Sequence, residues 1–349
     1  MSVEDLISEQ KRKGLRVALA ASVLFVASVA SGALVPFLGP LFAAQFLLSS
    51  SQPMPLGKTI GMAVVILAVG VFMMVLTSWF GDRPATFLLL LGLIYFSCFV
   101  AQTAGKGGAA VFLVLVVAVI APLLGILNKE LAASTLSILV GGVLGGAVMM
   151  WLAYVVIPEP PSIAETAPQP TTAAPDYLRA LANAAILLTA VAICLTSDNL
   201  TSAAVIPITV ASLLGQLDVA ASGRTAFGIV VVNLFGGVVA SIAYGVLMIR
   251  PSLFWMFVIV LVVSLLLGGR AAARSADAKV HAGALTTFLI LFGLGVSPLP
   301  GSAAESFSTR ILFVAMAIGY TLLTTALLWR RPRQVATGGA DSATNGGVL

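Results

Sequence analysis

Hydrophobic runs of about twenty residues follow one another along almost the whole chain, and a helix of that length matches the hydrocarbon core of a bilayer, about 30 Å thick. Of the 349 residues, 60% are hydrophobic and 9% are charged. Roughly a quarter of the residues of an ordinary soluble domain are charged, so this chain has too few charges to build a water-exposed surface. The sequence therefore predicts an all-α, polytopic membrane protein.

Charged residues, prolines and glycines divide the chain into twelve expected transmembrane helices. They cover residues 15–32, 34–51, 59–80, 84–103, 109–127, 131–156, 177–196, 200–217, 225–248, 251–269, 282–297 and 308–329. The second and the eighth are short and carry Pro36, Pro40 and Pro207. A tilted, broken or re-entrant segment stays open as the alternative for these two.

The basic residues indicate the orientation, because cytoplasmic loops of membrane proteins are enriched in Lys and Arg. With the N-terminus inside, the twelve helices place these residues on the cytoplasmic side: Lys11, Arg12, Lys13, Arg16, Lys58, Lys106, Arg179, Arg224, Arg270, Arg274, Lys279, Arg330, Arg331 and Arg333. The remaining basic residues, which fall outside, are Arg83, Lys129, Arg250 and Arg310. A missed helix would exchange the sides of every later loop, so this asymmetry favours both termini in the cytoplasm.

Two segments without apolar periodicity define the domain organisation. Residues 158–175 are rich in Pro, Ala and Thr and read as a flexible cytoplasmic linker, and residues 334–349 are rich in Gly, Ser and Thr and read as a disordered tail. The expected organisation is a first six-helix unit at 1–157, the linker, a second six-helix unit at 176–333 and the tail.

The two units carry the same landmarks in the same order, which indicates an internal repeat. The matching pairs are Pro40 and Pro207, Lys58-Thr59 and Arg224-Thr225, Arg83-Pro84 and Arg250-Pro251, and Ser134-Thr135 and Ser308-Thr309. Parallel six-helix repeats of this kind are known in transporters, whose substrate site lies between the repeats. A duplication that only enlarges the bundle is the alternative.

A family resemblance follows from these landmarks. A basic residue, Arg16, opens the first helix, the sequence VPFLGP lies in the second, and Lys58-Thr59-Ile60-Gly61 opens the third. The second half repeats them with Arg179, Pro207, Arg224-Thr225 and Gly228, and Arg310 opens the last helix. This order resembles the fusaric-acid-resistance (FUSC-like) superfamily, which includes the bacterial aromatic acid exporters, in a short form without the large cytoplasmic domains.

The resemblance implies an inner-membrane efflux component that often works beside a periplasmic adaptor of the membrane-fusion type. From it and from the lack of a nucleotide-binding motif we expect a secondary transporter, coupled to protons, that exports small amphipathic organic anions such as aromatic acids. A homo-oligomer is a further candidate assembly. Basic residues scattered singly between apolar runs do not form a nucleic-acid surface, so no nucleic-acid partner is expected.

Candidate substrate contacts are the polar groups that lie within or at the ends of the expected helices: Gln45, Asn183, Asn233, Arg83, Arg250 and Arg310. A buried amide must find a partner or line a wet path, and helix-to-helix hydrogen bonding is the alternative role. The arginines beside prolines could attract an anion to a helix N-terminus, or could reach lipid phosphate instead. Asp198 is the candidate proton carrier, with a turn and helix cap as its alternative.

No pattern in the sequence indicates an enzyme, a metal site or a bound cofactor. Cys98 and Cys194 lie in different halves, and His281 is the only histidine, so a metal-ligand spacing is lacking. Gly57-Lys58-Thr59 lacks the first glycine of a phosphate-binding loop, which Gln52 replaces. Two other classes stay open: a membrane-embedded enzyme on lipid-linked substrates, and a channel or scaffold subunit without its own transport cycle.

Overall fold

A computed structural model describes residues 3–49, 53, 55–105, 108–127, 129–158, 174–196, 205–217, 223–273, 278–297 and 305–328. These residues form twelve α-helices and no β-strand. The helices are α1 (Val3–Ala30), α2 (Leu38–Ser49), α3 (Leu56–Phe80), α4 (Pro84–Thr103), α5 (Gly108–Leu127), α6 (Lys129–Val156), α7 (Tyr177–Leu195), α9 (Val205–Leu217), α10 (Gly223–Ile249), α11 (Leu253–Ala271), α12 (Ala278–Val296) and α13 (Glu305–Leu328). The all-helical prediction is confirmed, and each expected helix has a counterpart.

Two helices are too short to cross a bilayer alone. The 12 residues of α2 and the 13 residues of α9 give lengths of about 18 and 20 Å at 1.5 Å per residue, against a hydrocarbon core of about 30 Å. Pro40 and Pro207 each lie in the first turn of their helix, where a missing N–H breaks no intrahelical hydrogen bond. The expected helix over 34–51 therefore starts too early, because residues 31–37 form turns and bends.

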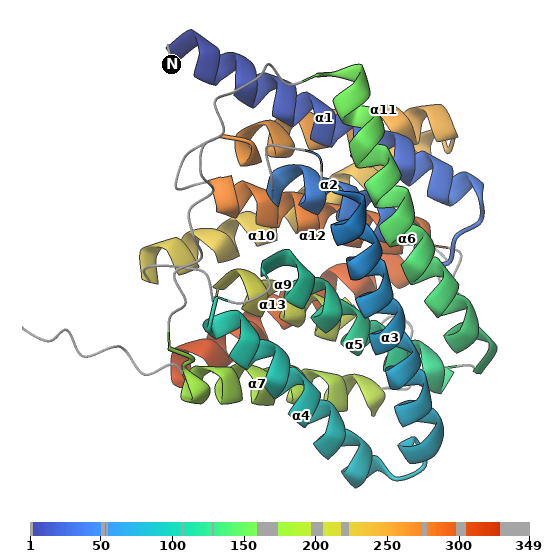
Figure 1. Ribbon diagram of the computed structural model, residues 1–349, viewed down its shortest axis with the longest axis vertical. Helices are drawn as coiled ribbons and strands as arrows, with labels where there is room; N and C mark the ends of the chain where they lie inside the picture. Colours follow the sequence, from blue (N-terminus) through green and yellow to red (C-terminus); the bar gives the residue numbers. More distant parts are fainter. Residues whose placement is uncertain are drawn as a thin grey trace, which may run out of the picture.

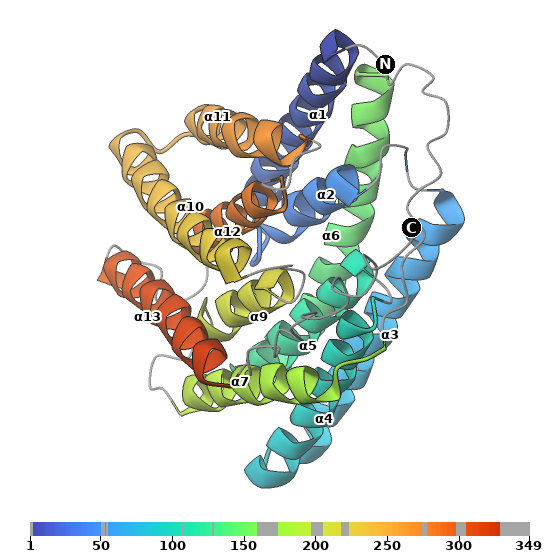
Figure 2. The same cartoon turned by 90° about the vertical axis from the view of Figure 1, so that its left-hand side faces the viewer.

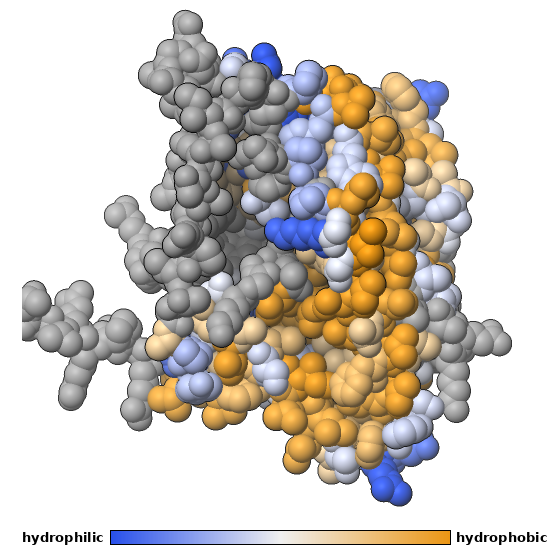
Figure 3. All heavy atoms as spheres, in the orientation of Figure 1, coloured by the Kyte–Doolittle hydropathy of each residue, from blue (hydrophilic) through white to orange (hydrophobic). Residues whose placement is uncertain are grey.

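Six of the described helices have a stretch that is long and apolar enough to span a membrane. These stretches are Ser8–Ala30, Leu56–Phe80, Pro84–Thr103, Ser137–Val156, Tyr177–Leu195 and Leu253–Ala271. Large apolar side chains on their outer faces are exposed, for example Trp79 at 74% and Leu266 at 66%. Figure 3 shows these hydrophobic residues as a broad band along the long axis of the molecule, with hydrophilic residues near its edges. This surface is typical of a helical membrane protein, whose solvent is lipid.

The helices pack so that elements far apart in the sequence become neighbours (Figure 1). α1 lies against α11 and α4 lies against α7, at opposite ends of the long axis (Figure 2). Between these two pairs, α2 contacts α12 and α5 contacts α9. The first six helices are thus joined to the last six along the whole length of the bundle.

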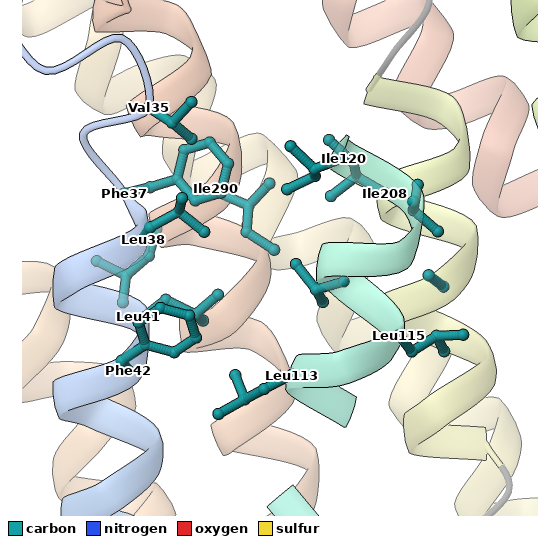
Figure 4. Packing of buried hydrophobic residues seen from close by; sticks show 14 of the residues in the cluster. Val35, Phe37, Leu38, Leu41, Phe42, Leu113, Leu115, Ile120, Ile208 and Ile290 are labelled. Atoms are coloured by element: carbon teal, nitrogen blue, oxygen red, sulfur yellow. The ribbon is translucent and has the colours of Figure 1, made fainter. Parts of the chain in front are cut away.

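The centre of the bundle is apolar and is built by the short helices and their neighbours. Figure 4 shows buried side chains of α2, α5, α9 and α12 facing one another. They include Leu38, Leu41, Leu113, Ile120, Ile208 and Ile290, and Phe37, directly before α2, lies beside them. Two aromatic contacts extend this cluster, since the ring of Phe292 lies 5.4 Å from those of both Phe25 and Phe288. Such packing holds α2 and α9 between longer helices, although neither helix is long enough to span the bilayer alone.

Candidate functional site

Three side chains near the start of α1 donate hydrogen bonds to the C-terminal ends of three other helices. Gln10 Nε2 lies 3.0 Å from the carbonyl oxygen of Gly269 in the last turn of α11. Lys13 Nζ lies 3.1 Å from that of Leu48 in α2, and Arg16 Nε lies 2.8 Å from that of Ile157, which directly follows α6. The last carbonyls of a helix lack intrahelical donors and carry the negative end of its dipole, so amide and cationic donors stabilise them.

Arg16 is the most buried charged side chain among the described residues, with 1% of its surface exposed. Its guanidinium lies over the ring of Tyr154 in α6, 4.4 Å from the ring centroid. Cation–π stacking and the hydrogen bond to Ile157 together compensate part of the cost of removing this charge from water. Arg16 therefore ties α1 to the end of α6 rather than standing in solvent.

The sequence interpretation treated Arg16 and Lys13 as markers of orientation and missed these contacts. A signal was present, because Gln10, Lys13 and Arg16 recur every three residues and so lie near one side of a helix. Lys11 lies on the other side of the helix and is exposed. Arg12 is also exposed although it is four residues from the buried Arg16, so spacing alone does not separate the interior cations from the surface cations in this segment.

The short helix α9 is held at its C-terminal end in the same way as α2. Gln102 Nε2, near the end of α4, lies 3.0 Å from the carbonyl oxygen of Gly215. Gly215 follows Pro207 by eight residues, as Leu48 follows Pro40. A cation thus binds the end of one short helix and a neutral amide binds the end of the other. Gln102 Oε1 is buried and accepts no hydrogen bond within the described structure.

Gln45, one of the predicted substrate contacts, lies where the two sets of helices meet. Its Nε2 donates to Thr286 Oγ1 over 3.0 Å, which joins the middle of α2 to α12. Gln45 is half-buried and Thr286 is buried. The amide has therefore found a partner across the bundle, as a polar group within a membrane helix must.

The other predicted site residues do not gather around Gln45 in the part of the chain that the structure describes. Asn183 is wholly buried in α7. Asn233 lies in α10 and Arg310 in α13, and the side chains of both lie outside the described set, as does the whole of Asp198. The candidate site that the structure describes therefore consists of Gln45 and of the hydrogen bonds that Gln10, Lys13, Arg16 and Gln102 donate to helix ends.

Arg83 and Arg250 are both exposed, and the structure does not bring them together. The α3–α4 and α10–α11 turns that carry them lie at separate corners of the molecule (Figure 2). The two Arg-Pro pairs also differ locally. Arg83 is the N-cap of α4 and Pro84 its first residue, whereas α11 begins at Leu253 with Ser252 as the N-cap, whose side chain accepts the N–H of Trp255. Pro251 therefore precedes the helix that it was expected to open.

A buried hydroxyl compensates for the proline inside α5. Pro122 has no N–H for the carbonyl of Ala118 four residues earlier. The hydroxyl of Tyr95 in α4, wholly buried, donates to that carbonyl oxygen over 3.3 Å. In lipid an unsatisfied carbonyl costs several kcal/mol, so this bond permits the proline at membrane depth.

Within the described residues, no group of three His, Cys, Asp or Glu side chains is arranged to hold a metal ion. Cys98 in α4 and Cys194 in α7 are both buried, free thiols. The chemistry that the described residues offer is therefore hydrogen bonding and charge at helix ends and between the two sets of helices.

In comparisons with known proteins, no protein-family model, no curated protein and no solved structure matches the chain.

Proposed function

We propose that this protein is a secondary transporter of the bacterial inner membrane, in which two equivalent six-helix halves move around a central path. Its substrates would be small amphipathic organic anions such as aromatic acids, exported in exchange for protons. A periplasmic adaptor and self-association are further proposals of the same account. The observation that carries the proposal is the pattern of contacts between the halves.

The contacts support two equivalent halves because they come in exchanged pairs. In the proposed repeat, α1 to α6 match α7, α9, α10, α11, α12 and α13, in that order. The contact of α1 with α11 then matches the contact of α7 with α4, and the contact of α2 with α12 matches the contact of α9 with α5. Contacts within the halves pair in the same way, as α2 on α6 corresponds to α9 on α13. A two-fold relation between parallel repeats produces this exchange, and transporters built so place the substrate site between the repeats.

The hydrogen bonds support the proposed orientation. Gln10 and Lys13 contact Gly269 and Leu48, and all four residues lie at helix ends that the distribution of basic residues places in the cytoplasm. Gln102 and Gly215 are likewise both expected at cytoplasmic ends. Arg16 and Ile157 make a further such pair, so each of these contacts joins ends expected on the same side.

The central path is proposed to run beside the short helices α2 and α9, because their helical parts are too short to bridge the bilayer alone. Gln45 would contribute to it from α2, with Asn183 and Asn233 as further polar groups on α7 and α10. Arg83, Arg250 and Arg310 would each attract anions at the outer end of its own helix, since the turns of Arg83 and Arg250 lie apart, and Asp198 would carry the coupling proton. Breaking the bond between Gln45 and Thr286 would accompany movement of one half against the other.

Transport by purified protein in proteoliposomes tests the proposal, with and without a pH gradient and with a panel of radiolabelled aromatic carboxylates. Gradient-dependent movement is expected. A leak that ignores the gradient would indicate a channel, and absence of movement for the whole panel would contradict the proposed substrate class.

Gln45→Leu should slow gradient-driven transport about tenfold, the effect of losing one polar contact of about 1.4 kcal/mol in the transport cycle. Ser97→Ala is the matched control, because Ser97 is exposed on α4 and its hydroxyl donates only within its own helix, to Leu93. Equal rates for both variants at equal amounts of inserted protein would remove Gln45 from the path.

A further inference from the structure

Three exposed cations directly follow, in sequence, the two residues that join the start of α1 to the last turn of α11. The hydrogen bond from Gln10 to Gly269 brings the start of α1 beside the last turn of α11. Lys11 and Arg12 follow Gln10 directly, Arg270 follows Gly269 directly, and all three side chains are exposed. One contact thus places cations from two helices distant in sequence at the same edge of the bundle.

The backbones fix this arrangement because they approach closely at the same place. A Cβ on Gly14 would lie 2.7 Å from the Cα of Gly269, a separation that real Cβ atoms do not show. Only glycine at position 14 therefore permits the crossing. The positions of the cations follow from this contact rather than from a flexible loop.

Below the cations, each helix presents an exposed apolar stripe. On α1, Leu15 is four residues from Lys11 and is 39% exposed, and Val23 continues the stripe. On α11, Leu266 is four residues from Arg270 and is 66% exposed, with Val262 next. Residues four apart share a helix face, so each stripe starts beneath a cation and runs toward the middle of the membrane band.

We propose that Lys11, Arg12 and Arg270 bind the phosphate of an anionic phospholipid in the adjacent leaflet, while its acyl chains lie along the two stripes. A soluble anion would use the cations alone, whereas a lipid uses the cations and the apolar surface together. Glu9 is the acidic side chain described in this part of α1; it is half-buried, and the three cations outnumber it. The proposal rests on the membrane location and not on the transport function.

The effect of the cations on lipid binding can be measured by native mass spectrometry of the full-length protein in a neutral detergent. The probes are dioleoylphosphatidylglycerol and, as the neutral lipid, dioleoylphosphatidylcholine. The variant Lys11→Gln/Arg12→Gln/Arg270→Gln should bind the anionic lipid about a hundredfold more weakly, since each surface Lys or Arg contributes roughly fivefold to binding of anionic lipid. Binding of the neutral lipid should stay the same.

The matched control is Arg83→Gln/Arg250→Gln, which removes exposed cations that lie elsewhere on the molecule. This variant should retain the binding of the anionic lipid. Unchanged affinity in the triple variant, an equal loss in the control, or equal affinity of the wild type for the two lipids would each overturn the proposal. Competition with glycerol phosphate separates the two sources of phosphate: it should displace the lipid only weakly, and displacement at concentrations similar to those of the lipid would show a site for soluble phosphate instead.

Discussion

Replacing Arg16 with alanine is expected to lower the free energy of unfolding by about 2 to 5 kcal/mol, the range for removing a large buried side chain. Two physical losses contribute to this value. The ring of Tyr154 loses the guanidinium stacked 4.4 Å from its centroid, and the carbonyl of Ile157 loses the donor that lies 2.8 Å away. Unfolding in mixed detergent micelles with increasing dodecyl sulfate measures the change.

Two further substitutions separate the charge of Arg16 from its shape. Arg16→Met retains an apolar stem but no donor, and Arg16→Lys retains a charge but loses the planar guanidinium that both stacks and donates. We expect Arg16→Lys to recover only part of the lost stability. Lys58→Ala is the control, because Lys58 is an exposed cation on α3, and its effect should stay within about 0.5 kcal/mol. An Arg16→Ala protein as stable as the Lys58→Ala protein would contradict the tie between α1 and α6.

Adding one methyl group at position 146 is expected to cost about 1 to 3 kcal/mol, and Gly146→Leu should cost more, because the crossing of α6 and α2 leaves no room. A Cβ on Gly146 would lie 2.8 Å from the Cβ of Phe42 and 3.0 Å from the backbone nitrogen of Ala43. Both atoms belong to the rigid part of α2, so the helices would have to move apart. The thermal midpoints of the purified proteins in detergent measure these losses, and they should fall in the order wild type, Gly146→Ala, Gly146→Leu.

The neighbouring glycines of α6 provide controls, because their replacement by alanine is expected to raise the stability of the protein rather than to lower it. A Cβ on Gly141 would meet nothing within 4 Å, and one on Gly145 would lie at an ordinary 3.6 Å from the tip of Leu24. Gly141→Ala and Gly145→Ala should therefore stabilise the helix by up to about 1 kcal/mol, because alanine loses less conformational entropy than glycine on folding. Destabilisation of the same size at all three positions would contradict the packing of α6 on α2.

The glycine positions show what the sequence could and could not determine. Glycines four residues apart, such as those of α6, are typical of close helix packing, and the structure shows such packing at Gly142 and Gly146. The alternative pair, Gly141 and Gly145, has the same four-residue spacing, so periodicity alone could not choose between them. The choice depends on which face α2 covers, and that is a property of the tertiary structure.

The helices themselves were predictable because a hydrophobic run long enough to span lipid has few other solutions. The residues at which the helices begin and end were less predictable. α1 begins at Val3 rather than at residue 15, since its polar first turns are held by contacts such as Gln10 to Gly269. Which candidate site residues lie near one another was the least predictable, because Arg83 and Arg250 occupy matching positions in the sequence but lie in turns at separate corners of the molecule.

The central proposal is that this is a polytopic membrane protein whose chain crosses the bilayer at every expected helix, with the short helices α2 and α9 crossing together with the segments that flank them. Single cysteines introduced into a Cys98→Ser/Cys194→Ser background, and labelled with a membrane-impermeant maleimide in intact and in permeabilised cells, test it directly. Labelling in intact cells is expected for Ser31→Cys, Asp82→Cys and Arg250→Cys. Labelling only after permeabilisation is expected for Lys11→Cys, Lys58→Cys and Arg270→Cys. If Lys11→Cys and Lys58→Cys were labelled from opposite sides, α1 and α2 together would cross once, and the arrangement of every later helix proposed here would be wrong.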